Sequence, residues 1–101
     1  MAGTKKQPTK KTVKPGKDLV ESTVEDFKEK LLKIVNQGTK VLSIDMKNVN
    51  NVDSTGLGVL IAAKNSLNQS GGQLILKGAP EDIGSFLQAL GLEDFFEISS
   101  T

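Results

Sequence analysis

One short segment concentrates the side chains that could do chemistry, residues 52–58 with the sequence VDSTGLG. It follows the apolar run 41–46 and opens a long helical pattern, so it places hydroxyls where a strand passes into a helix. At such a place the free backbone N–H groups and the positive end of the helix dipole favour an anion such as a phosphate. Asp53, Ser54 and Thr55 are also common capping residues, and capping alone accounts for one of the three.

Two glycines in this segment, Gly56 and Gly58, are not explained by capping. Each costs a helix roughly 1 kcal/mol relative to alanine, so we interpret them as keeping a surface bare beside Ser54. Val59 and Ala62 lie off the predicted core stripe of the same helix. They either extend this contact surface or pack inside a half-buried helix.

Several classes of chemistry are excluded by composition. The 101 residues include no cysteine and no histidine, so the usual zinc ligands and the commonest general base are missing. A serine nucleophile at Ser54 would lack that base, and Val52 stands where a Gly-x-Ser-x-Gly motif needs its first glycine. We therefore expect a protein that is not an enzyme and that binds no metal or cofactor.

The charges divide the chain into two parts. Residues 1–17 hold six lysines and no acid, whereas residues 18–101 hold seven lysines and all twelve acids, a net charge of −5. We interpret 1–17 as a flexible lysine-rich tail and 18–101 as the folded domain. The tail has no arginine or aromatic residue to read bases, so nucleic acid is not the expected partner. The absence of cysteine and of any apolar run near 18 residues favours a cytoplasmic protein without a membrane span.

The order of the predicted elements indicates an α/β fold. A first helical pattern starts near Val24, where Ser22 and Glu25 resemble a capping box. A second covers 54–68, and a third starts at Pro80. In the second pattern the expected core residues are Leu57, Leu60, Ile61 and Leu67. Strand patterns cover 41–46, 73–77 and 95–98. Because strands alternate with helices, we predict a small mixed sheet of about four strands with helices packed on it.

These motifs together resemble a known family. The strand 41–46, the segment Asp-Ser-Thr-Gly-Leu-Gly, the helix after it, the Gly71-Gly72 turn and the strand 73–77 are similar to a STAS domain of the bacterial anti-sigma factor antagonist type, over roughly residues 19–99. Such domains usually begin with two strands and a Gly-x-Leu-Asp turn. Here Gly16 or Lys17 stands for the glycine and Val20 for the aspartate, so the first strand is expected to be weak, displaced or absent.

The resemblance implies a function in partner switching. In that family the serine after the aspartate is phosphorylated by a partner kinase, usually itself the anti-sigma factor, and this serine is Ser54 here. The implied partners are that serine kinase, which supplies ATP and Mg, and a phosphatase that reverses the modification. We expect a partner-binding surface with the following members: Asp53, Ser54, Thr55, Gly56, Gly58, Val59 and Ala62.

A second hypothesis stays open at this point. The chain could be a scaffold or accessory STAS domain in a sensory, chemotaxis or lipid-transport assembly, in which Ser54 is never modified. The sequence names neither the partner nor the oligomeric state.

Overall fold

Residues 10–99 fold as two parallel sheets, one of four strands and one of two, with three helices. The structure, a computed structural model, describes residues 10–99. In chain order the elements are β1 (Lys10–Val13), β2 (Asp18–Leu19), α1 (Val24–Asn36), β3 (Val41–Asp45), β4 (Asn51–Val52), α2 (Ser54–Gln69), β5 (Gln73–Lys77), α3 (Glu81–Ala89) and β6 (Glu97–Ser99). The main sheet has the order β1-β3-β5-β6, and β2 pairs with β4 in a separate two-stranded ladder.

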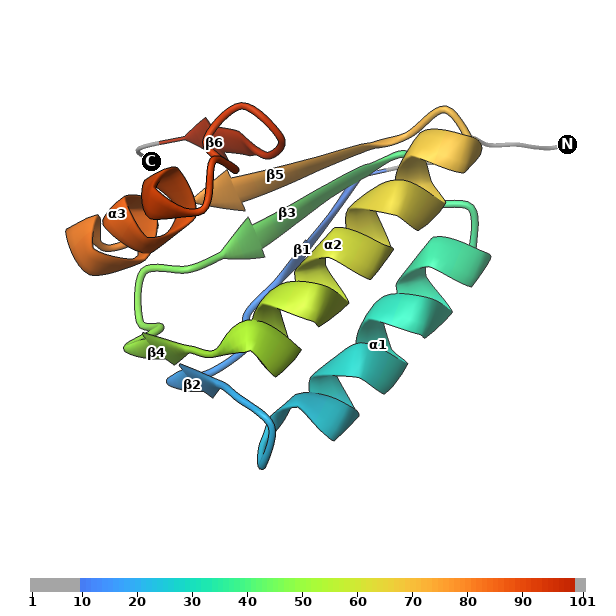
Figure 1. Ribbon diagram of the computed structural model, residues 1–101. Coiled ribbons are helices and arrows are strands. Elements are labelled where there is room, and N and C mark those ends of the chain that lie inside the picture. Colours follow the sequence, from blue (N-terminus) through green and yellow to red (C-terminus); the bar gives the residue numbers. More distant parts are fainter. Residues whose placement is uncertain (1–9, 100–101) are drawn as a thin grey trace, which may run out of the picture.

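The helices and the small ladder surround the main sheet in a definite arrangement. Figure 1 shows α1 and α2 side by side across one face of the sheet, with α3 near the arrowhead of β5. The β2-β4 ladder lies near the carboxyl end of β3, next to the start of α2. Since functional sites in such sheets gather at the carboxyl ends of the strands, this arrangement places the start of α2 where a site is expected.

The core lies between the sheet and the two long helices. Leu42 and Ile44 of β3 are fully buried, as is Leu76 of β5, because alternate side chains of a strand point to the same face. From the helices, Leu60 and Leu67 of α2 are buried in the same core. Met46 and Val49, in the segment between β3 and β4, are also fully buried and anchor the connection that leads to the site.

The predicted α/β class and the strands at 41–46 and 73–77 are confirmed, with the first of these ending at Asp45, whereas the predicted mixed sheet and the predicted bounds of the last strand are wrong. Every ladder among the described residues runs parallel, so the sheet is not mixed. The last strand covers Glu97–Ser99, and Phe95 and Phe96 belong to the turn before it.

The boundary predicted at residue 17 does not hold for the part that the structure describes. Lys10–Val13 forms β1 and pairs with Val41–Ile44 of β3, so the domain extends at least to Lys10. Three of these four side chains are exposed and only Val13 is buried, which is why composition gave no strand signal. The rest of the predicted tail, residues 1–9, lies outside the described residues.

The capping box predicted at Ser22 and Glu25 is wrong. The residue before α1 is Thr23, and no side chain caps this helix. The Thr23 hydroxyl instead donates to the carbonyl of Asp18 at 2.8 Å, which closes the turn between β2 and α1. That turn adjoins the candidate site, because the backbone N–H of Glu21 in it donates to Asp53.

Candidate functional site

Asp53 fastens the start of α2 to the neighbouring turn. One carboxylate oxygen, Oδ1, accepts from the backbone N–H of Gly56 at 2.9 Å and caps the helix. The other, Oδ2, accepts from the N–H of Glu21 at 3.0 Å, and the N–H of Asp53 donates to the carbonyl of Leu19 at 3.3 Å. The bonds from Gly56 and then Glu21 hold the pKa of Asp53 below its ordinary value, because they stabilise the ionised form.

Ser54 is the first residue of α2 and its side chain is exposed. Within residues 10–99 its hydroxyl has no hydrogen-bond partner, since the capping role is filled by Asp53. Thr55 follows and is also exposed. The site therefore presents an unengaged hydroxyl at the positive end of a 16-residue helix, a position that stabilises a negative charge.

The two glycines of the segment have different roles. A Cβ on Gly56 would lie 1.9 Å from the carbonyl oxygen of Leu19, and Leu19 itself is fully buried. Gly56 is thus needed for the close approach of α2 to β2, and its prediction as part of a partner-binding surface is wrong because it is buried. Gly58 is exposed, and a Cβ there would meet no atom within 4 Å. The fold gives no reason for the second glycine.

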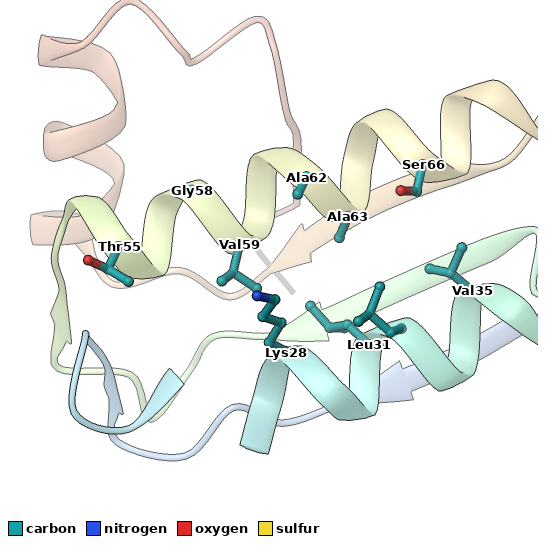
Figure 2. Close-up of a pocket in the computed structure, with 10 residues that line it drawn as sticks. Lys28, Leu31, Val35, Thr55, Gly58, Val59, Ala62, Ala63 and Ser66 are labelled. Carbon is teal, nitrogen blue, oxygen red and sulfur yellow. The ribbon is translucent and has the colours of Figure 1, made fainter. Parts of the chain in front are cut away.

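A groove next to these residues runs between α1 and α2. It has a volume of about 280 Å³, and Figure 2 shows the side chains that line it. From the predicted surface it contains Thr55, Gly58, Val59 and Ala62, of which Val59 is half-buried and Ala62 exposed. From residues that the sequence analysis did not single out as functional it contains Lys28, Leu31, Leu32, Val35, Ala63 and Ser66.

Apart from Asp53, which caps α2, the predicted site residues fall into three positions. Thr55, Gly58, Val59 and Ala62 share the groove wall that α2 provides, whereas Ser54 stands one residue before the groove. Gly56 faces inward. A signal for the missed wall was present in α1, since Leu32 is apolar but lies off the stripe of Phe27 and Leu31 that enters the core.

The part of the chain that the structure describes contains neither a cluster of metal-ligating side chains nor a membrane-spanning helix. Over residues 10–99, no three His, Cys, Asp or Glu side chains lie close enough together to hold a metal ion. In the same range, no helix combines the length and the apolar character needed to span a bilayer.

Comparison with known proteins gives concordant matches. The family model described as STAS domain matches residues 3–101. The anti-sigma-B factor antagonist of Staphylococcus aureus (strain NCTC 8325 / PS 47) is 32% identical over 87 residues, which cover 86% of this chain and 81% of the relative. The protein of the same name from Staphylococcus epidermidis is 33% identical over the same shares of the two chains.

Two solved structures share the fold. A candidate anti-sigma factor antagonist from Thermotoga maritima matches with a TM-score of 0.77 and 23% identity, covering 94% of this chain and 76% of that one. The anti-sigma factor antagonist SpoIIAA in its unphosphorylated form matches with a TM-score of 0.73 and 21% identity, covering 87% and 79%.

Proposed function

This chain belongs to the STAS domain family, among its anti-sigma factor antagonists, and we propose that it is a binding protein controlled by phosphorylation of Ser54. In the unphosphorylated state it binds a switch-protein kinase and thereby releases a sigma factor or another regulated target. The kinase supplies ATP and Mg and transfers a phosphoryl group to Ser54. The phosphorylated chain no longer binds until a phosphatase removes the group.

The observation that carries the proposal is the exposed, unengaged Ser54 hydroxyl at the first residue of α2. A kinase needs its acceptor hydroxyl free of internal hydrogen bonds and open to solvent, and Ser54 meets both conditions among the described residues. The neighbouring carboxylate of Asp53 accepts from two backbone N–H groups, and among the described residues it makes no hydrogen bond to the Ser54 hydroxyl.

Charge and volume explain how the modification would act. A phosphate adds about −1.5 to −2 charges and a bulky group beside Asp53. At a helix N-terminus this charge is favourable for the helix itself, so the backbone need not change. A partner surface shaped for a small neutral hydroxyl, however, meets both the added volume and the added charge. The expected switch is therefore electrostatic and steric rather than a conformational change.

A phosphorylation assay tests the proposal directly. The purified chain is incubated with ATP, Mg and each small serine kinase of its source genome, and in parallel with the anti-sigma-B factor of Staphylococcus aureus. Mass spectrometry then locates the phosphate. We expect one phosphate on Ser54, none on Ser54→Ala, and an unchanged yield on Ser85→Ala, which removes an exposed helical serine far along the chain.

Two outcomes would count against the proposal. Phosphate on another residue would move the switch away from Ser54. Binding of a kinase that is equal for wild type, Ser54→Ala and Ser54→Asp, with no phosphate transferred, would leave only a docking role of the kind expected of a scaffold domain.

A further inference from the structure

The groove between α1 and α2 extends well beyond Ser54. On α2 it runs from Thr55 to Ser66, a distance of about 16 Å along the helix, and on α1 it runs from Lys28 to Val35. Figure 2 shows these residues along the two facing helices, with Lys28 reaching from α1 toward Val59. Thr55, the residue after Ser54, thus lies at one end of a long, mainly apolar groove.

The α2 wall of this groove includes a row of small residues. Gly58, Ala62 and Ser66 follow one another at intervals of four residues, so their small side chains form one row along the helix. Gly58 belongs to this row although the fold does not require a glycine there. On the opposite wall Leu32 is a large apolar side chain that is 50% exposed. Small side chains on one wall and an exposed leucine on the other leave space for large apolar side chains of a partner.

The walls also restrict the form of that partner. A strand could add to this surface only through unpaired backbone groups, and both walls are helices whose backbone groups are bonded internally. The occupant must therefore enter with side chains. Two helices that lie side by side leave a straight groove, and a third helix can place its ridge of side chains into it.

The lining of the groove carries one charge, and that charge is positive. Residues 10–99 hold eleven lysines and twelve acids, yet no acid lines the groove and α2 contains none. Lys28 is the one charged side chain among the lining residues, and within residues 10–99 it has no ion-pair partner. An acidic group of the partner would meet this free ammonium.

From these observations we propose that the groove binds an amphipathic helix of the kinase, with large apolar side chains against Leu32 and the Gly58 row and with a carboxylate at Lys28. The inference rests on the proposed function and names the element of the partner that is recognised. The proposal also accounts for the weaker binding of the phosphorylated chain. A phosphate on Ser54 stands beside the groove mouth, where it repels the carboxylate that Lys28 attracts.

Isothermal titration calorimetry with the kinase that modifies the chain tests the groove. Leu32→Glu is expected to weaken binding at least about tenfold, as for a residue central to an interface. Leu90→Glu is the matched control, because Leu90 is 51% exposed and lies outside the groove, and it should leave the affinity unchanged. Lys28→Glu should weaken binding similarly, whereas Lys33→Glu, an exposed lysine of α1 outside the lining, should not.

A cross-linking experiment tests that the occupant is a helix. The chain has no cysteine, so Ser66→Cys provides a single attachment point for a benzophenone cross-linker at the far end of the groove. We expect cross-links to kinase residues spaced three or four apart, next to an acidic residue. Cross-links to kinase residues spaced two apart would contradict a helical occupant. So would the absence of cross-links in a complex that binds with wild-type affinity.

The outcomes separate this inference from the proposed function. If Ser54 is phosphorylated and Ser54→Asp prevents binding, but Leu32→Glu and Lys28→Glu bind like the wild type, the groove proposal fails and the switch stands. If Leu32→Glu alters only self-association of the chain, the groove takes a second copy and the proposal also fails. If no kinase binds or modifies the chain, both fail.

Discussion

The two glycines at the start of α2 should respond in opposite ways to the same substitution. Gly58→Ala adds a methyl group in open space, so the helix gains the propensity difference of about 1 kcal/mol. Gly56→Ala gains the same amount but places its Cβ 1.9 Å from the Leu19 carbonyl oxygen and 2.7 Å from its carbon. Because Leu19 is fully buried and cannot move aside, we expect a loss of about 3 kcal/mol or more, a net destabilisation of at least about 2 kcal/mol.

Thermal unfolding followed by circular dichroism measures both effects. One kcal/mol corresponds to about 4–8 °C in a domain of this size. Gly58→Ala should therefore raise Tm by about 4–8 °C, and Gly56→Ala should lower it by more than about 8 °C. Denaturant titration of the same variants provides the free energies. Equal Tm values for the two variants would refute the close approach of α2 to β2, and a large loss in Gly58→Ala would refute the open space at that position.

Three further predictions concern the site and the first strand. Because the pKa of Asp53 is lowered, its ionised carboxylate stabilises the folded state at pH values above its ordinary pKa of 3.8. This stabilisation is lost as the pH falls through the lower pKa of the folded state. A pH series should therefore show that the Tm difference between wild type and Asp53→Asn shrinks in that range. Phosphorylation of Ser54 should leave Tm unchanged or slightly raised, with NMR shifts confined to the start of α2 and the adjoining turn, and shifts across the sheet would contradict a rigid switch. Removing residues 1–17 deletes β1 and its ladder to β3, so Tm should fall by more than about 8 °C; an unchanged Tm would show that the domain begins after residue 17.

The sequence was sufficient for the parts of the site that local chemistry determines. The strand 73–77 has a clear apolar pattern, and the start of α2 at Ser54 follows from a polar capping segment before a long helical period. These signals depend on neighbours along the chain. For that reason the position of the exposed hydroxyl could be predicted before any packing was known.

The parts that the sequence missed depend on contacts between distant residues. β1 is an edge strand, held by backbone bonds to β3, and its lysines give no apolar alternation. The inward position of Gly56 depends on Leu19, 37 positions earlier in the chain, so two neighbouring glycines could not be told apart. The α1 wall of the groove exists only because α1 packs beside α2 and leaves Leu32 uncovered.

The most direct test of the central claim compares two states of one chain. The dissociation constant of the kinase is measured for the unphosphorylated chain and for the chain phosphorylated stoichiometrically on Ser54, in the same buffer and at two salt concentrations. We predict that the phosphate weakens binding at least about 100-fold, a difference of about 2.7 kcal/mol. Equal affinities for the two states would contradict the claim that a phosphate on Ser54 controls binding.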